Sequence, residues 1–266
     1  MGLAHENHVV RDTGLVRIDD FRCQEHNGCF GGEECSSTAT LTFVRDGAYE
    51  RESARGRALI DANQVDFYNP AEPYRVRHPV GSGDRCTTIS LRDGVLDEPF
   101  PWLSAPCDGR TFLMQRMLLL HARDADTLAV DETALRLVDA TLAAGRAAGT
   151  RDEDQHAAHR DLAEHAKQVL ARRFRERLLL EDVAAETECS PFHLARTFSR
   201  TVGTTLHRYL TRLRLHAALE PIVSGQDLAA VALDHGFANQ SHLTTAFGRE
   251  FGTTPARARG RAARSA

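Results

Sequence analysis

The chain has 266 residues, 42% of them apolar and 26% charged, which is typical of a soluble protein with two domains of ordinary size. No run of about 18 apolar residues occurs, and the first ten residues lack a cationic stretch followed by an apolar one, so we expect neither a membrane span nor a secretory signal. The sequence therefore favours the cytoplasm, where the six cysteines would mostly stay thiols.

Charge is distributed unevenly along the chain. Residues 155–266 contain 16 Lys and Arg against 11 Asp and Glu, a formal charge of +5, whereas residues 1–154 contain 17 against 26, a charge of −9. A basic segment beside an acidic one is typical of a nucleic-acid-binding module joined to a separate domain, although ordinary solvated surfaces vary by as much.

The first predicted elements are strands. Between about Thr38 and Leu91, apolar and polar residues alternate in short runs, separated by turn signals at Asp46-Gly47, Asn69-Pro70 and Gly81-Ser82-Gly83. Many short strands at close spacing indicate an antiparallel sandwich or barrel. The apolar and aromatic residues of these runs are Leu41, Phe43, Tyr49, Leu59, Ile60, Val65, Phe67, Tyr68, Tyr74, Val76, Ile89 and Leu91.

From Arg110 the apolar spacing becomes helical, near 3.6 residues. We expect an amphipathic helical connector over about 111–147 and propose it as a homodimer interface. Residues 149–154 are polar, as in a linker, and the chain beyond Gln155 is nearly all helical by pattern. The predicted division is thus 1–109, 110–154 and 155–266. The apolar positions of the connector are Phe112, Leu113, Met117, Leu120, Leu128, Leu135, Val138 and Leu142.

An internal repeat lies in the predicted helical segment. Leu180, Val183 and Ala184 recur 48 positions later as Leu228, Val231 and Ala232. One extra residue just before a helix cap, where a turn can absorb it, then changes the offset to 49. At that offset Ser190, His193, Leu194, Phe198, Arg200, Gly203, Thr204 and Thr205 correspond to Asn239, His242, Leu243, Phe247, Arg249, Gly252, Thr253 and Thr254.

Each copy is predicted to fold as a helix, a tight turn and a second helix. In the first copy we expect a short helix over 180–186, and then a helix that Ser190 caps and Pro191 begins, because the missing N–H of proline costs nothing there. Leu194 and Phe198, four residues apart, face the core of this unit, and Gly203 ends the helix.

The second copy follows the same plan. We expect a short helix over 228–234, a positive φ at Gly236, and a cap at Asn239 for the next helix, which ends at Gly252. Leu243 and Phe247 of that helix face inward. Between the copies, a helix from about Leu206 to Glu220, ahead of Pro221, would hold the two units at a fixed separation. Its apolar stripe consists of Leu206, Leu210, Leu213 and Ala217.

From the residues alone, the repeat fits either a duplicated helical bundle or two helix-turn-helix units. The run Gly236-Phe237-Ala238-Asn239-Gln240-Ser241-His242-Leu243, followed by Phe247 and Phe251-Gly252-Thr253-Thr254-Pro255, closely resembles the signature of the AraC/XylS family of bacterial transcription regulators. Thr211-Arg212-Leu213-Arg214-Leu215 resembles the linker helix of that family, and the resemblance covers about residues 161–259.

This resemblance implies that one monomer places two recognition helices in successive major-groove segments of double-stranded DNA, about 34 Å apart. Arg196 matches a family position that commonly contacts bases, with a solvated surface arginine as the alternative, and Gln240 can pair with adenine. Phe192 could pack on a thymine methyl group or cover the edge of the core. The candidate base contacts are Phe192, Arg196, Gln240, Ser241, Thr244 and Thr245. The candidate phosphate contacts are Arg200, Arg208, Arg212 and Arg249.

The second copy departs from the family pattern at three places. The family often has arginine at the position of Thr245 and a longer cationic residue at Gly248, and an aromatic residue normally follows Pro255. We therefore expect weaker recognition of the second half-site and leave the C-terminal tail open.

The strand-rich segment resembles the cupin-type sensor domain of many AraC-like regulators in residues 43–49, 69–74, 78–80 and 83–87. The resemblance implies an α+β chain made of a cupin-like barrel, a helical connector and an all-α DNA-binding domain. It also implies a small-molecule effector and RNA polymerase as partners. Polar residues that would line a pocket, unless strand alternation places them in solvent, are Tyr68, Tyr74, Arg75, His78 and Arg85.

Thiols and imidazoles that suit zinc or copper occur at Cys23, His26, Cys29, Cys35, His78 and Cys86. Because Cys23 and Cys29 do not form a CxxC pair, the sequence favours incidental cysteines, and we expect no metal and no other cofactor.

Two other classes of protein remain as alternatives. One is a cupin enzyme, against which the lack of a His-x-His pair followed by Glu argues. The other is a thiol acceptor like the adaptive alkylation-response regulators, whose cysteine spacing this chain does not share. With no visible nucleophile and base, we expect no enzymatic activity.

Overall fold

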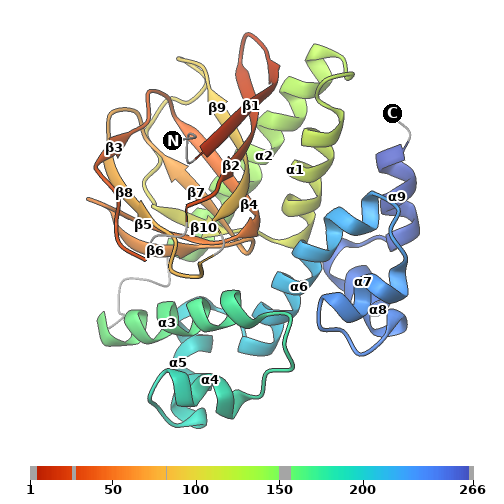
Figure 1. Ribbon diagram of the computed structural model, residues 1–266. Helices are drawn as coiled ribbons and strands as arrows, with labels where there is room; N and C mark the ends of the chain where they lie inside the picture. Colours follow the sequence, from red (N-terminus) through yellow and green to blue (C-terminus); the bar gives the residue numbers. More distant parts are fainter. Residues whose placement is uncertain (1–4, 26–27, 82, 150–156, 264–266) are drawn as a thin grey trace. The chain divides into compact units, whose positions relative to one another are not determined.

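The computed structural model describes residues 5–25, 28–81, 83–149 and 157–263 (Figure 1). The chain divides into two compact units, the first reaching Arg146 and the second running from Ala147 to Ala263. Residues 150–154 of the predicted linker lie outside the described residues, as do His26 and Ser82. The boundaries at 109/110 and 154/155 stay predictions.

The first unit is built on two antiparallel sheets, as the alternation of apolar and polar residues predicts. One sheet has the strand order β1–β2–β9–β4–β7–β10, and the other has the order β3–β8–β5–β6. Within the described residues no strand pairing joins the two sheets into a closed barrel, so the cupin-like barrel stays a prediction. The strands are β1 (His5–Asp12), β2 (Val16–Cys23), β3 (Glu34–Cys35), β4 (Thr40–Gly47), β5 (Tyr49–Ser53), β6 (Gly56–Ile60), β7 (Gln64–Tyr68), β8 (Pro73–Arg77), β9 (Asp84–Leu91) and β10 (Ser104–Pro106).

Strands β1 and β2 precede the segment in which the sequence predicts strands. β1 is an edge strand and mostly exposed, so histidine and charged residues replace the apolar positions that alternation requires. β2 pairs along its whole length with β9, from Val16 opposite Leu91 to Cys23 opposite Asp84. β1 and β2 thus form one end of the six-stranded sheet, and the sequence analysis did not predict either strand.

The core of the first unit lies between the sheets. Val44 of β4 and Cys86 of β9 pack against Tyr49 of β5 and Ile60 of β6, and none of the four is more than 3% exposed. The first six residues of β4 are all buried, which is typical of a central strand covered on both faces.

Helices α1 (Gly109–His121) and α2 (Thr127–Gly149) form the predicted connector and belong largely to the first unit. α1 packs on β2 and β9. In α2 the buried residues are Val130, Ala134, Leu137, Val138, Thr141 and Gly145. Leu128 and Leu135, which we expected in the helical stripe, are 73% and 37% exposed, because these other positions form the buried face of the helix.

The second unit is all-helical, as predicted. Short helices α4 and α7 have the bounds expected from the repeat, and α6 lies between the α4–α5 pair and the α7–α8 pair (Figure 1). No helix within the described ranges is both long and apolar enough to cross a membrane. The helices are α3 (Ala157–Arg173), α4 (Leu180–Glu186), α5 (Pro191–Val202), α6 (Leu206–Val223), α7 (Leu228–Asp234), α8 (Gln240–Phe251) and α9 (Pro255–Ala262).

One feature of this unit differs from the sequence prediction, and another concerns the C-terminal tail, which the sequence left open. α6 does not end ahead of Pro221 but continues to Val223, because a proline in the last turn removes one hydrogen bond while the N–H of Ser224 still donates to the carbonyl of Glu220 at 3.0 Å. The tail after Pro255 forms α9, whose N-cap Thr254 accepts a hydrogen bond from the N–H of Arg257 at 3.3 Å.

Candidate functional site

The turns of the two helix-turn-helix units have the same backbone geometry. Glu188 in the first turn adopts φ 54°, and Gly236 in the second adopts φ 75°. In each turn the N–H of the following residue donates to the carbonyl of an alanine in the preceding helix, at 3.1 Å and 2.9 Å. The two residues are 48 positions apart, so the sequence repeat is also a backbone repeat.

Helices α5 and α8 begin and end in the same way. Ser190 and Asn239 are the N-caps, and each side chain accepts a hydrogen bond from the N–H three residues later, at 3.2 Å and 2.9 Å. Gly203 and Gly252, with φ 77° and 66°, are the left-handed C-caps. These caps confirm the expected ends of both helices.

One face of α5 is buried and the opposite face is open. Leu194 and Phe198 are fully buried, as predicted. Phe192, Arg196 and Arg200 are exposed and follow one another at four-residue spacing, which aligns them along one stripe of the helix. Phe192 is 76% exposed, so it does not cover the edge of the core.

α8 presents a less basic exposed face. Leu243 and Phe247 are fully buried. Of the candidate contacts, Thr244 is half-buried, whereas exposed side chains occur at Gln240, Ser241, Thr245 and Arg249. The chemistry of this face is mainly that of amide and hydroxyl groups, with Arg249 near its C-terminal end.

In each repeat, one arginine connects the helix that follows the helix-turn-helix unit to the end of the helix that precedes it. Arg214 of α6 donates to two carbonyls just beyond α3, those of residues 174 and 176, both at 2.6 Å. Burial lowers the pKa of Arg214. Arg259 of α9 donates likewise to the carbonyls of Ile222 and Gln226, at 3.0 Å and 2.6 Å, around the end of α6. The structural repeat therefore extends beyond the residues that the sequence repeat matches.

The remaining candidate phosphate contacts lie on α6. Arg208 is exposed. Arg212 instead forms an ion pair with Glu250 of α8, with 2.8 Å between Nε and Oε1, and both side chains are only 12% exposed. The geometry places Arg212 as a link between α6 and α8.

A half-open pocket of about 650 Å³ lies in the first unit, lined by residues of both sheets. Three of the predicted effector-binding residues line it, namely Tyr68, Tyr74 and His78. Among the lining residues that the sequence did not put forward as effector ligands are Asp19, Cys23, Glu25, Thr40, Tyr49, Asp84, Cys86 and Thr88.

Arg75 and Arg85 do not line the pocket, and strand alternation explains why. Arg75 lies between Tyr74 and Val76, which face the pocket, so its side chain points the other way and pairs with Glu52 at 2.5 Å. Arg85 likewise lies between two lining residues of β9, and it is half-buried outside the pocket.

Under the pocket, a buried polar network joins the two sheets. Asp66 of β7 accepts hydrogen bonds from Arg51 at 2.6 Å and from the Tyr49 hydroxyl at 2.8 Å. The guanidinium of Arg51 stacks 4.1 Å from the ring centre of Tyr68. Burial, reinforced by the charge of Asp66, raises the pKa values of Tyr49 and Tyr68, so both phenols stay protonated.

A second polar group lies in the wall of the pocket. His78 Nε2 is 2.7 Å from Asp84 Oδ1, and the Cys86 thiol donates to Asp84 Oδ2 at 3.0 Å. Burial alone lowers the pKa of His78, but hydrogen bonding to Asp84 and Cys23 outweighs it and raises the value to about 10. Burial, followed by the charge of Asp84, raises the pKa of Cys86.

The second unit is similar to known proteins. Residues 183–261 match the family described as a helix-turn-helix domain. The chain is 34% identical over 93 residues to the bifunctional transcriptional activator/DNA repair enzyme AdaA of Bacillus subtilis. This match covers 35% of the chain and 44% of AdaA. The chain is also 32% identical over 85 residues to the probable transcription factor PqrA of Proteus vulgaris. That match covers 32% of the chain and 70% of PqrA.

A solved structure is also similar to part of the chain. It is a transcriptional regulator from Chromobacterium violaceum, described by its AraC-type DNA-binding domain, with 23% identity and a TM-score of 0.38. The match covers 42% of this chain and all of that structure. The chain thus spans less than half the length of AdaA, but most of PqrA and all of the solved regulator.

Proposed function

The chain belongs to the AraC family of helix-turn-helix transcription regulators, and we propose that it reads two adjacent major-groove segments of double-stranded DNA with α5 and α8. The observation that carries the proposal is the structural repeat. Two helices with the same caps, the same buried stripe and an open opposite face follow turns of the same geometry, and α6 lies between the two units. This arrangement fits recognition of two half-sites from one face of the duplex.

Sequence preference would come from the exposed stripe of each helix. Arg196, which is exposed, would form a bidentate contact with guanine, and the exposed Phe192 would pack on a thymine methyl group. On α8, Gln240 offers an amide for adenine, supported by Ser241, Thr244 and Thr245. The arginine-rich face of α5 favours the stronger recognition of the first half-site.

Phosphate contacts would set the affinity and its salt dependence. Arg200 and Arg249 are exposed on the recognition helices and Arg208 is exposed near the start of α6, so they are the candidates. For Arg212 we propose an indirect role in place of a direct phosphate contact, since its guanidinium pairs with Glu250 and so holds α8 against α6.

For the first unit we propose a cupin-type sensor domain that binds a small-molecule effector in its pocket. Tyr68, Tyr74 and His78 are the candidate ligands that remain from the sequence prediction. We further propose that the protein acts in the cytoplasm as a homodimer, through the exposed leucines of α1 and α2, and contacts RNA polymerase. These leucines are Leu120, Leu128 and Leu135. An effector would act through different affinities for two arrangements of the dimer.

We do not extend to this chain the repair activity that the name of AdaA includes, and we propose that it is not an enzyme. The match covers 44% of AdaA, and the cysteines do not follow the metal–thiolate spacing of alkylation-response regulators. Mass spectrometry of the chain after reaction with methylated DNA tests this expectation. An unchanged mass supports it, whereas transfer of one methyl group to a cysteine would contradict it.

The proposed function is tested by selecting bound duplexes from a random pool with the purified, reduced chain. We expect two enriched half-motifs whose centres lie about one helical turn apart. Binding without any enriched sequence would contradict sequence-specific recognition by the free protein. Enrichment of a single half-motif would contradict the use of both recognition helices.

A further inference from the structure

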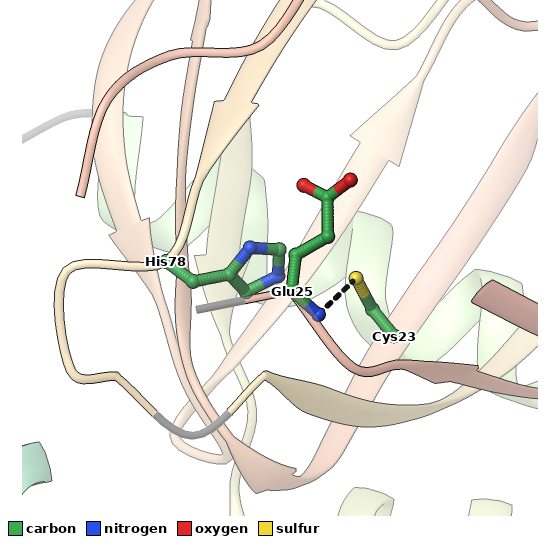
Figure 2. Close-up of side chains that lie close together, drawn as sticks. All are labelled: Cys23, Glu25 and His78. Carbon is green, nitrogen blue, oxygen red and sulfur yellow. Dashed lines mark hydrogen bonds between the residues drawn. The ribbon is translucent and has the colours of Figure 1, made fainter. Parts of the chain in front are cut away.

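Three metal-binding types of side chain converge in the wall of the pocket (Figure 2). Cys23 ends β2, Glu25 lies two residues further on, and His78 directly follows β8. One ligand atom from each, a sulphur, a carboxylate oxygen and a ring nitrogen, lie within 4.8 Å of one another. The backbone N–H of Glu25 also donates to Cys23 Sγ at 3.5 Å, which holds the chain after β2 folded around the sulphur.

The surroundings of His78 match those of a metal-ligating histidine. Its side chain is 4% exposed, and its ring interacts with both Asp84 and Cys23. Its Nε2 is held by Asp84 at 2.7 Å. Histidine ligands of metals almost always donate their second ring N–H to a carboxylate or a carbonyl, which orients the ring and raises its basicity.

Asp84 is itself fixed in position. It lies directly opposite Cys23 in the pairing of β2 with β9, and its second oxygen accepts a hydrogen bond from the Cys86 thiol at 3.0 Å. The strand pairing therefore sets the distance between the sulphur on β2 and the imidazole that Asp84 orients. Such support by strands and outer hydrogen bonds is what a pre-organised metal site requires.

The mixture of ligands distinguishes between cations. Calcium and magnesium prefer sites made of oxygen ligands, and copper(I) prefers thiolate and thioether sulphur. Zinc accepts a set of one thiolate, one imidazole and one carboxylate. In tetrahedral geometry these three ligands leave the fourth coordination position unfilled by the protein.

We propose that the pocket of the first unit binds one Zn²⁺ through Cys23 Sγ, a ring nitrogen of His78 and the carboxylate of Glu25, with the fourth coordination position open to the cavity. Binding requires the thiolate and the neutral imidazole, so the cation displaces the protons that these groups carry in the metal-free chain. The open position would take water or a donor atom of the effector. All ligands belong to the first unit, so metal binding can be measured separately from DNA binding by the second unit.

The test uses the full chain, stripped with a chelator, reduced, and then dialysed against Zn²⁺ or Co²⁺ alone. Elemental analysis gives the stoichiometry, a competition titration gives the affinity, and the sulphur-to-cobalt charge-transfer band reports a thiolate ligand. The variants are Cys23→Ser, Glu25→Gln and Asp84→Asn. Cys29→Ser is the matched control, because it removes an exposed thiol outside the cluster.

We expect about one Zn²⁺ per chain for the parent and for Cys29→Ser, and a cobalt–thiolate band that Cys23→Ser abolishes. Glu25→Gln changes an exposed side chain, so it tests the site without a risk to folding, and we expect it to weaken binding at least about tenfold. Asp84→Asn, which removes the outer carboxylate, should weaken binding about 10- to 100-fold. Loss of metal in Cys29→Ser, retention in Cys23→Ser, or a parent chain that holds no zinc would each overturn the proposal.

Discussion

Glu188 and Gly236 occupy the same position in the two helix-turn-helix turns, and both have a left-handed backbone, with φ 54° and 75°. Glycine adopts this conformation freely, whereas a residue with a Cβ is strained by roughly 1–2 kcal/mol. The second turn thus has the residue that its geometry favours, and the first turn does not. The two copies share a backbone but differ in the strain that it carries.

Replacing Glu188 with glycine should therefore stabilise the second unit. We expect a gain of up to about 1 kcal/mol, because relief of the strain is partly offset by the greater freedom of glycine in the unfolded chain. The melting temperature should rise by a few degrees. The reverse change, Gly236→Ala, is the contrast: its Cβ would lie 2.9 Å from both the carbonyl of Arg175 and Nε of Arg214, so it should destabilise. A loss of stability in Glu188→Gly would contradict the inference that the backbone at Glu188 is strained.

Gly145 of α2 lies against the indole of Trp102, and Gly145→Ala should destabilise the first unit. Alanine normally stabilises a helix relative to glycine by about 1 kcal/mol, but a Cβ here would lie 2.5 Å from the indole ring. We expect a net loss of about 1–3 kcal/mol in denaturant unfolding. Gly248→Ala in α8 is the matched control, since its Cβ would meet nothing closer than 3.9 Å and should stabilise. Equal gains in both variants would show that α2 does not pack as described.

Arg196 and Arg200 should contribute to DNA binding in different ways. Arg196→Ala should cost about 1–3 kcal/mol on the best site and relax the preference for one base pair in the first half-motif. Arg200→Ala should weaken all sequences about equally and reduce the salt slope of log Kd by about 1. Titrations of both variants against the selected site and its single-base variants, at several salt concentrations, separate the two effects. An Arg196→Ala variant that keeps its base preference would contradict direct readout by α5.

The sequence was most informative where local chemistry sets local structure. The caps at Ser190 and Asn239, the glycine at Gly236 and the repeat fix the helices of the second unit without reference to the rest of the chain. Such signals depend on residues that are neighbours in sequence, so they can be recognised without a structure.

The contacts that the sequence did not anticipate join residues that are distant in sequence. We expected Arg212 to contact a DNA phosphate, because no residue near it in sequence indicates its partner Glu250. Glu250 comes close to Arg212 only when α8 packs on α6. We expected Arg75 to line the pocket, because the alternation of side chains along a strand defines two faces but does not show which face lines the pocket. Cys23, Glu25 and His78 show no ligand spacing, since the pairing of strands brings them together. No sequence pattern reveals these contacts, because the fold creates them.

The cysteines should differ sharply in their reactivity toward iodoacetamide. Cys29 and Cys35 are exposed, whereas Cys86 and Cys107 are 1% and 0% exposed, and burial also raises the pKa of Cys86. Because the thiolate is the reactive form, we expect rapid labelling of the first pair and labelling of the second pair only after unfolding. Peptide mass spectrometry gives the result, with the denatured chain as the control. Fast labelling of Cys86 in the folded chain would contradict the packing between the two sheets.

The most direct test of the central claim varies the spacing between the two half-motifs of the selected site. If one chain places α5 and α8 in adjacent major-groove segments on one face of the duplex, inserting about 5 bp, roughly half a turn, moves one half-site to the opposite face. Affinity measured by titration should then fall to that of a single half-site, and inserting a full turn should not restore it, because α6 holds the units at one separation. An affinity that does not change with the half-turn insertion would contradict simultaneous recognition by the two helices.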